Sequence, residues 1–327
     1  MIGYNMSLVS VIIPVYNAAA LINRCLDSVF NQTGDIDTEV IIIDDGSTDN
    51  SLELVKKRPE KDRIRIFCQV NSGPAKARNK GIQEAKGKYL AFLDADDYWL
   101  PEFLIKTTHF LEEKKDCIAV SVAQKHVIAS GTYEMPQNWK NLATSEGKII
   151  KNFFEFWCLN DHICTGSILI KTTIAKLTGG QREDLRICED LEYWALLSTY
   201  GELGFIPELL FVSDGAKVTK AVGWVDKNLS RWNSAPKIEV WQKRLMERNP
   251  AILNNPNFIN ARGKIAKNLS YSILLSKRLD LAKEQIIKYG YSFPDDKISK
   301  LLKLAIKNHI LWKLITNFLI FREYHRK

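Results

Sequence analysis

The sequence lacks the motifs that mark several common classes of nucleotide- and metal-binding protein. It has no GxGxxG after its first predicted strand and no GxxxxGK[ST], so dinucleotide-binding and P-loop interpretations lose their main support. Its six cysteines are scattered and form no CxxC pair. This spacing is typical of reduced, buried thiols in a cytosolic protein, because disulfide frameworks and structural zinc sites need paired cysteines.

The sequence also has little that points to secretion or to nucleic acid. Its N-terminal segment has no basic stretch ahead of an apolar one and no small-residue cleavage site, so we expect no secretory signal. Most of the net charge of +8 lies in residues 297–327, which hold eight basic residues and one acid, Glu323. Because the rest of the chain is nearly neutral, we expect no nucleic-acid partner.

The first hundred residues alternate between apolar runs and amphipathic stretches. Strands are predicted at 10–17, 38–43, 63–70 and 89–94, and helices at 18–32, 51–58 and 74–87. The strands are continuously apolar, which is typical of a parallel sheet covered by helices on both faces. In such a sheet, ligands bind beyond the carboxyl ends of the strands.

The pattern changes twice further along the chain. Strands at 117–128, 166–172 and 205–212, with a helix at 190–201, predict a mixed α/β arrangement. Residues 255–290 have the periodicity of a helical hairpin. We therefore predict an α/β domain, residues 1–218, followed by a mostly helical region, residues 219–327.

Three acids directly follow the fourth predicted strand, at Asp94, Asp96 and Asp97. In an Asp-x-Asp pair at a strand end, both side chains point the same way. Two such carboxylates suit Mn²⁺ or Mg²⁺, whose remaining positions take water and phosphate oxygens. Asp97 has two open interpretations, as a further ligand or as the N-cap of a short helix.

Four segments, in this order and at these separations, resemble the family 2 glycosyltransferases of the GT-A fold. They are SVIIPVYN (10–17), VIIIDDGSTDNS (40–51), ARNKGIQEAKGKYLAFLDADD (77–97) and CEDLEYW (188–194). The resemblance covers roughly the first two-thirds of the chain. It implies a Rossmann-like, mostly parallel nucleotide-binding sheet and a metal-dependent enzyme that takes a hexosyl or N-acetylhexosaminyl group from a nucleotide-sugar.

The resemblance also implies a role for individual residues. Tyr16 would lie against the base, Asp45 would accept a hydrogen bond from it, and Asp96 would bind the metal directly, with Asp94 shared between ribose and metal. From the residues alone, 44–47 fits equally well a turn with Asx-type hydrogen bonds. The nucleotide-binding residues are expected to be Pro14, Tyr16, Asn17, Asp45, Arg78, Asp94 and Ala95.

The Glu-Asp pair of the family matches Glu189 and Asp190. We expect Asp190 to be the general base that removes the proton from the acceptor hydroxyl, with Glu189 assisting. A single base without a covalent nucleophile implies inversion at the anomeric carbon. The alternative is stabilisation of the helix dipole by first-turn acids, which is the role expected for Glu192.

The chain departs from the family in two places. Gln181 stands where the family often has phenylalanine, so the acceptor loop is expected to differ or to be more polar. Where many relatives have a histidine after the last strand, FVSDGAKVTK offers only Asp214 or Lys217. Sugar stacking and core packing are both open for three tryptophans, Trp224, Trp232 and Trp241.

The basic tail, residues 297–327, has two competing interpretations. Its apolar stretch is too short to span a bilayer. The first is a peripheral anchor with lysines on anionic headgroups, which we favour. The second is a helix pair packed on the protein or on a second copy in a homodimer. The side chains expected in the membrane interface are Trp312, Leu314, Phe318, Leu319 and Phe321.

The leading hypothesis is an inverting glycosyltransferase that moves a sugar from a UDP-sugar to a glycan or lipid-linked oligosaccharide. The family resemblance places it in bacterial surface-polysaccharide synthesis, in the cytoplasm at the inner face of the membrane. A sugar-1-phosphate nucleotidyltransferase is the alternative enzyme, but VYNAAALINRCL has no glycine-rich basic loop. A non-catalytic sugar-binding protein should have lost a metal carboxylate or the base, and this chain has both.

Overall fold

The computed structural model describes residues 8–128, 130–137, 139, 147–160, 163–215 and 224–325. The chain forms two compact units. The first combines Met1–Glu183 with Leu196–Lys220, and the second combines Asp184–Ala195 with Ala221–Lys327. The predicted domain division after residue 218 stays a prediction, and it did not separate the short segment Asp184–Ala195 from the sheet.

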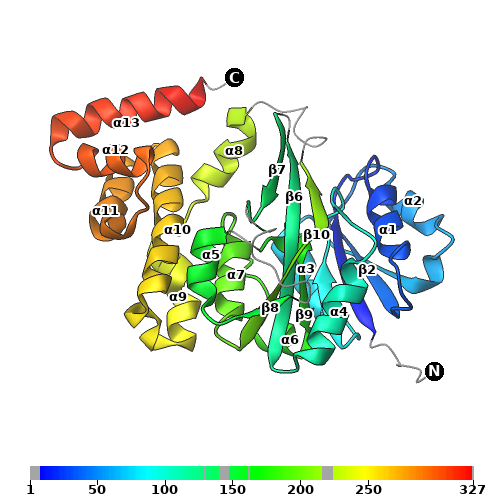
Figure 1. The fold of residues 1–327 in the computed structure, drawn as a ribbon. Helices are drawn as coiled ribbons and strands as arrows, with labels where there is room; N and C mark the ends of the chain where they lie inside the picture. Colours follow the sequence, from blue (N-terminus) through cyan, green and yellow to red (C-terminus); the bar gives the residue numbers. More distant parts are fainter. Residues whose placement is uncertain are drawn as a thin grey trace. The chain divides into compact units, whose positions relative to one another are not determined.

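The first half of the sheet is parallel, as predicted. Its strand order is β3-β2-β1-β4, and each neighbouring pair runs in the same direction (Figure 1). The strands are β1 (Val9–Val15), β2 (Thr38–Asp44), β3 (Ile64–Cys68) and β4 (Tyr89–Phe92). Nearly every side chain of β1, β2 and β4 is buried, because helices cover this sheet on both faces.

The second half of the sheet mixes strand directions. Strand β9 pairs antiparallel with β4 and β6, whereas β6 and β10 are parallel. The strands of this half are β5 (Tyr98–Trp99), β6 (Cys117–Ile128), β7 (Gly131–Met135), β8 (Lys148–Ile150), β9 (Ile168–Lys171) and β10 (Glu202–Asp214). The strand predicted at 117–128 has the same bounds in the structure. The direction of β9 could not be predicted, because it depends on a partner about eighty residues away.

The helices of the first unit flank this sheet. They are α1 (Ile22–Phe30), α2 (Ser51–Lys56), α3 (Pro74–Glu84), α4 (Phe103–Glu113), α5 (Phe153–Asn160) and α6 (Thr172–Leu177). Helix α3 begins at Pro74 as predicted. The expectation that it ends at Gly87 is wrong. Gly87 instead allows a close approach of backbones, since a Cβ there would lie 2.6 Å from the carbonyl oxygen of Leu8.

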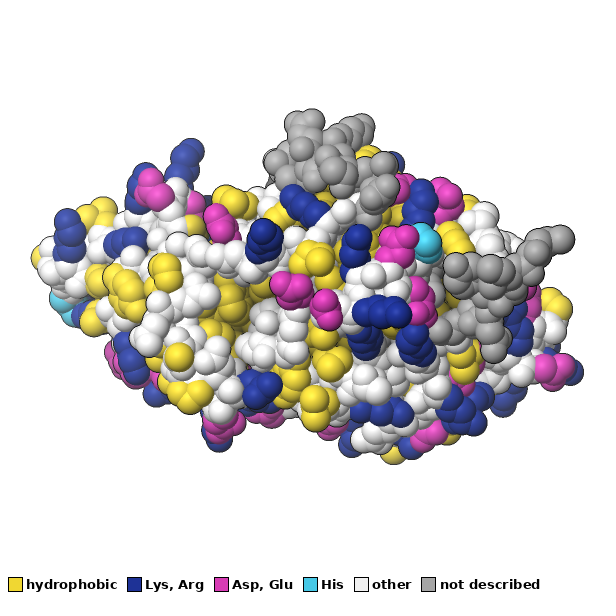
Figure 2. All heavy atoms as spheres, turned by 60° about the horizontal axis from the view of Figure 1, so that its bottom comes forward, with side chains coloured by type: hydrophobic (Ala, Val, Ile, Leu, Met, Phe, Trp, Pro, Cys, Tyr) yellow, Lys and Arg dark blue, Asp and Glu magenta, His cyan; other side chains and the backbone are white. Residues whose placement is uncertain are grey.

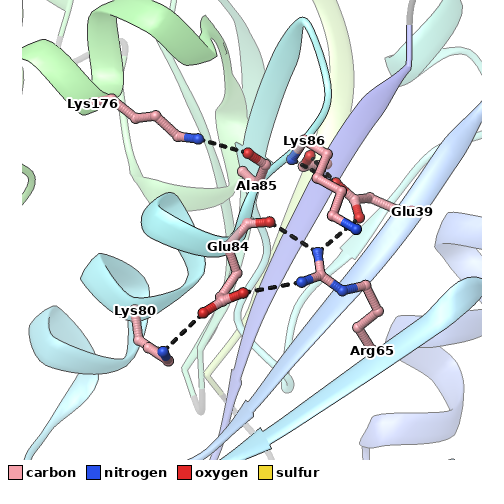
Figure 3. A network of polar contacts seen from close by, with 8 residues as sticks. Glu39, Arg65, Lys80, Glu84, Ala85, Lys86 and Lys176 are labelled. Carbon is pink, nitrogen blue, oxygen red and sulfur yellow. Dashed lines mark hydrogen bonds and ion pairs between the residues drawn. The ribbon is translucent and has the colours of Figure 1, made fainter.

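A polar network ties the C-terminal end of α3 to the sheet (Figure 3). Arg65 on β3 donates to Glu39 on β2 at 3.1 Å and to Glu84 on α3 at 3.0 Å. Lys80 pairs with the same Glu84 at 2.8 Å, and the Lys176 ammonium donates to the Ala85 carbonyl at 2.8 Å. Several partly buried, charge-assisted hydrogen bonds therefore fix the orientation of α3.

The second unit is helical. It contains the first part of α7 (Glu189–Leu197) and then α8 (Trp224–Asn233), α9 (Ile238–Arg248), α10 (Pro256–Leu275), α11 (Leu279–Tyr289), α12 (Lys297–Ala305) and α13 (His309–Tyr324). Helices α10 and α11 form the predicted hairpin. Gly263 on α10 permits a close crossing, because a Cβ there would lie 1.8 Å from the Ser292 carbonyl oxygen.

Helix α13 packs on α10 through one of its faces. Tyr324 donates from its hydroxyl to the Leu275 carbonyl at 3.1 Å, and Tyr271 donates to Glu323 at 3.1 Å. Trp312 and Leu319 are buried. The prediction that these two side chains enter a membrane interface is therefore wrong, because they form part of the packing of this unit.

Charge is mixed over the surface drawn in Figure 2. Basic and acidic side chains are interspersed there with hydrophobic ones among the residues drawn in colour. This distribution agrees with a nearly neutral body and a basic C-terminal segment.

Candidate active site

The eight sequence-predicted nucleotide and metal residues line one cavity of the first unit. Its volume is about 500 Å³, and it lies where β1, β2 and β4 end. The predicted residues on its wall are Pro14, Tyr16, Asn17, Asp45, Arg78, Asp94, Ala95 and Asp96. Sequence reasoning missed Val15, Ala18, Leu21, Asn71, Gly73 and Pro74. Asn71, Gly73 and Pro74 could have been predicted, because they follow β3 and parallel strands end at the same edge of a sheet.

The loop after β1 is fastened to the loop after β2. Asn17 has a φ of 50°, and its side-chain oxygen accepts from the Thr48 N–H at 2.8 Å. Its own N–H donates to the Ser47 hydroxyl at 3.1 Å, and the Ala18 N–H donates to Ser51 at 2.9 Å. These bonds hold Tyr16 in place with its side chain exposed, so it offers a flat aromatic surface at the cavity.

Asp45 is buried and anchors the loop in front of α3. One carboxylate oxygen accepts from the Ser72 N–H and the Gln69 side chain, and the other accepts from the Gly73 N–H, each at 2.8 Å. Asp44 instead accepts from the Ser47 N–H at 3.3 Å, as the turn interpretation predicts. A contact between Asp45 and a base stays a prediction, and three of its roughly four acceptor positions are already used.

Arg78 on α3 is buried and joins two distant segments. Its Nη2 donates to Asp94 Oδ1 at 2.6 Å, and its Nη1 donates to Gln181 Oε1 at 3.2 Å. The Gln181 backbone is clamped by Asn79, with both hydrogen bonds at 2.7 Å. The glutamine that replaces the family's phenylalanine thus supplies a polar partner for Arg78. Its Nε2 has no hydrogen-bond partner among the described residues.

Four aspartates lie close together at this end of the sheet: Asp94 and Asp96 line the cavity, and Asp97 and Asp214 lie next to them. Burial and repulsion from Asp94 and Asp96 raise the pKa of Asp97 to about 8, and burial and Asp94 also raise the pKa of Asp96. Asp97 accepts from the Asp214 N–H at 2.9 Å. The helix-cap interpretation of Asp97 is wrong, because α4 begins only at Phe103.

Asp214 is already engaged. It forms an ion pair with Arg24 on α1, and Arg24 also donates to the backbone carbonyl of Asp96. Asp214 is one of the two residues expected to replace the histidine that many relatives have after the last strand. The ion pair occupies one of its carboxylate oxygens. Lys217, the other candidate, lies outside the described residues.

The donor chemistry of Asp94 and Asp96 fits a divalent cation. The described residues contain no preformed group of three or more His, Cys, Asp and Glu side chains around one point. Mg²⁺ needs only one or two protein carboxylates when phosphate oxygens and water complete its coordination. The raised pKa of Asp96 reports the crowding of negative charge that a cation would relieve.

The predicted base lies in the second unit. Glu189 and Asp190 begin α7 and are half-buried. The residue before them, Cys188, has a φ of 60° and accepts from the Trp241 indole at 3.2 Å. This contact fixes the turn that presents the two acids, since a left-handed non-glycine residue needs support from its surroundings.

Glu192 has a different role from the one expected. It is fully buried, and it accepts from Arg244 Nε at 2.9 Å and Nη2 at 2.5 Å. The prediction that it only stabilises the helix dipole is therefore wrong. The bidentate ion pair ties α7 to α9 within the second unit.

The tryptophans fill the core of the second unit. Trp232 and Trp241 are buried, which confirms core packing for both. The side chain of Trp224 lies outside what the structure describes.

Comparison with known proteins now gives the family. The model of Glycosyl transferase family 2 matches residues 10–175. The chain belongs to glycosyltransferase family 2. It is 44% identical over 109 residues to an uncharacterized glycosyltransferase of Haemophilus influenzae, which is 33% of this chain and 43% of that one. It is 44% identical over 113 residues to the chondroitin synthase of Pasteurella multocida, which is 34% of this chain and 12% of that one. The matches thus cover less than half of these curated relatives.

The same fold occurs in a protein whose structure has been solved. TarS 1–349 of S. aureus aligns with 98% of this chain and 92% of its own, with a TM-score of 0.65 and 16% identity. TarS 1–349 in complex with UDP aligns with 87% of this chain and 90% of its own, with a TM-score of 0.56 and 20% identity. This likeness confirms the predicted α/β GT-A fold with a helical C-terminal region.

Proposed function

We propose that this family 2 chain is an inverting glycosyltransferase that uses a UDP-sugar. The observation that supports this most directly is the cavity of about 500 Å³, whose wall combines the exposed Tyr16, the paired Arg78 and Asp94, and Asp96. An aromatic face suits a base, and a guanidinium beside carboxylates suits a diphosphate with its cation. TarS, which shares the fold, has been solved with UDP and with UDP-GlcNAc.

The donor would be held by groups that hydrogen bonds within the protein already orient. Tyr16 would stack on the base, and the free acceptor position of Asp45 would meet its imide N–H. Pro14, Asn17 and Ala95 line the wall beside them. Because backbone hydrogen bonds fix Asn17 and Asp45, little ordering of these loops is needed when the nucleotide binds.

Asp96 and Asp94 would hold Mn²⁺ or Mg²⁺. When bound, the cation neutralises charge on the diphosphate and makes it a better leaving group. Arg78 keeps Asp94 in place through the 2.6 Å hydrogen bond, so the carboxylate pair is set before the donor arrives.

Asp190 would remove the proton from the acceptor hydroxyl, and Glu189 would orient that acceptor. An α-linked donor then gives a β-linked product. We propose a glycan or lipid-linked oligosaccharide as the acceptor, used in bacterial surface-polysaccharide synthesis at the inner face of the cytoplasmic membrane. The match to chondroitin synthase supports a polysaccharide product, as does the 42% identity over 116 residues to the poly(ribitol-phosphate) beta-glucosyltransferase of Bacillus spizizenii.

The test is a panel of UDP-, GDP- and dTDP-sugars with Mn²⁺ or Mg²⁺, in which release of nucleoside diphosphate is measured with lipid-linked acceptors. We expect turnover with a UDP-sugar and loss of it when the cation is chelated. Asp190→Asn should slow transfer at least about 100-fold while UDP affinity stays unchanged. Full activity of that variant would refute the assignment of the base.

A second assay with UTP and a sugar-1-phosphate, in which pyrophosphate is measured, separates the two alternatives when run beside the panel. A nucleotidyltransferase would release pyrophosphate from UTP and a sugar-1-phosphate. A non-catalytic sugar-binding protein would bind the donor and release nothing with any acceptor. Either result would overturn the proposed transfer reaction.

A further inference from the structure

Helix α13 has two apolar faces, and the second unit uses only one of them. Its buried residues are Trp312, Thr316, Leu319 and Glu323. Their spacing of four, three and four places them on one side of the helix. This side contacts α10, so the packing of α13 within its own unit is accounted for by this stripe.

The opposite side carries a second apolar stripe that the described part of the chain leaves uncovered. Ile310, Leu314, Phe318 and Phe321 are each between 55% and 70% exposed. At 100° per residue they fall within an arc of about 80°, centred almost opposite the buried stripe. Single exposed apolar side chains are ordinary, but four aligned along a helix mark an interaction surface.

The charges around these four residues, which we call the outer stripe, indicate the chemistry of its binding partner. Residues 297–325 include six basic side chains, of which five are exposed: Lys297, Lys300, Lys307, Lys313 and Arg322. Their single acid, Glu323, is buried and accepts from Arg322 at 2.7 Å. An exposed acid, Asp295, lies just before α12 and pairs with Lys300 at 2.9 Å. Within α13 itself the exposed charges are basic, so the outer stripe lies among aliphatic and aromatic groups with positive charge beside them.

We infer that the outer stripe of α13 binds the surface of an anionic lipid bilayer, with the helix lying in the plane of the interface. A helix of 16 residues is about 24 Å long, enough to seat all four apolar side chains at the acyl boundary. Lys313 and Arg322, which at 100° per residue fall on opposite flanks of the stripe, would contact anionic headgroups. No helix within the described residues is long and apolar enough to cross a membrane.

A second copy of the chain fits this surface less well. Pairing two outer stripes would bring Lys313 and Arg322 of each copy close to those of the other, and like charges across an interface oppose association. The bilayer satisfies the apolar stripe and the lysines at once. This inference does not depend on which sugar or acceptor the enzyme uses.

The test is flotation of the full chain with vesicles of phosphatidylcholine, with and without phosphatidylglycerol. We expect binding only to the vesicles that contain phosphatidylglycerol, and at least about tenfold weaker binding for the double variant Leu314→Ser, Phe318→Ser. The matched control is Ile287→Ser on α11, which removes an exposed apolar side chain outside the stripe and should bind like the wild type. Thermal unfolding of the double variant should match that of the wild type, because both side chains are exposed.

Two further outcomes decide the inference. Replacing Lys307 and Lys313 with glutamine should weaken binding to anionic vesicles and reduce its salt dependence. Vesicle binding by the double variant equal to that of the wild type would overturn the inference. A wild-type dimer in sedimentation that the double variant dissociates, without vesicle binding by either, would assign the stripe to a second copy instead.

Discussion

Arg78 Nη2 lies 2.6 Å from Asp94 Oδ1, and this pair links α3 to the acidic end of the fourth strand. The guanidinium is almost fully buried, whereas the carboxylate is partly exposed on the wall of the cavity. The arginine therefore serves as a fixed support for the carboxylate and as a cation facing the proposed diphosphate site.

Removal of the Arg78 guanidinium should weaken binding of the nucleotide donor. We expect Arg78→Met to lower the affinity for UDP about 10- to 100-fold, since a charge-assisted hydrogen bond contributes about 1.5–3 kcal/mol. Calorimetry with UDP and Mg²⁺ measures the change. Lys76→Met is the control, because Lys76 is an exposed cation on the same helix. Equal affinity in the two variants would show that Arg78 does not face the nucleotide.

Substitution of Gln181 should change the affinity for UDP more than it changes the stability of the fold. Gln181→Leu removes the acceptor that orients Arg78, so we expect UDP to bind about 2- to 10-fold more weakly. It removes a buried amide nitrogen that lacks a partner among the described residues, but it also takes this acceptor from buried Arg78. Because the two effects oppose each other, the free energy of unfolding should change by no more than about 1 kcal/mol.

Calorimetry and urea unfolding measure the two quantities for Gln181→Leu. Gln83→Leu makes the same change at an exposed site on α3 and serves as the control. A fall in stability with unchanged UDP affinity would mean that Gln181 has only a packing role.

The buried ion pair between Arg244 and Glu192 predicts that substitutions of the two residues have non-additive effects on the free energy of unfolding. Arg244→Met leaves the fully buried Glu192 carboxylate without its bidentate partner and should cost about 3 kcal/mol. Adding Glu192→Gln to that variant should restore part of the loss, because the buried charge is then gone. Urea unfolding of both single variants and the double variant gives the coupling energy, and simple additivity would contradict a direct pair.

Glu239 on α9 predicts a pH dependence of stability. Partial burial raises the pKa of Glu239, but hydrogen bonds from Lys288 and Gln285, among others, outweigh it and lower that pKa to about 2. Between about pH 4.5 and pH 2 the unfolded chain therefore binds more protons at this residue than the folded chain. Its contribution to stability is present above pH 4.5 and is lost as the pH falls towards 2.

The variant Glu239→Gln tests this sign. It should be less stable than the wild type at neutral pH, and the difference should shrink when urea unfolding is repeated at about pH 3. Glu247→Gln, at an exposed acid on the same helix, is the control. A difference that grows on acidification would contradict the direction of the pKa shift.

Local pattern was sufficient for the elements that build the cavity. The runs at 10–17 and 89–94 are strands because they are continuously apolar, and helix α3 begins at Pro74 because proline suits a first helical turn. Pro14 lies at the end of β1 and Arg78 within α3, and the other predicted nucleotide and metal residues follow β1, β2 or β4. Parallel strands place these strand ends at one edge.

Contacts between segments far apart in the sequence could not be predicted from local pattern. Arg78 and Gln181 are 103 positions apart, and Asp97 and Asp214 are 117 apart. The local sequence of Asp97 fits both a helix cap and an acceptor for the Asp214 N–H on β10. In both roles a carboxylate oxygen accepts from a backbone N–H. Glu192 likewise looks like any first-turn acid until Arg244 on α9 lies beside it.

By itself the sequence determined the alternating α/β order, the parallel first half of the sheet and the acids at its carboxyl edge, because these follow from periodicity and chain direction. Only the tertiary structure decided the partners of those acids, the burial of Glu192 and which side of α13 stays exposed. The physical reason is that a helix with apolar residues on two faces has no local preference between them. Trp312 is buried and Phe318 is exposed because α10 covers the first of these faces and leaves the second open.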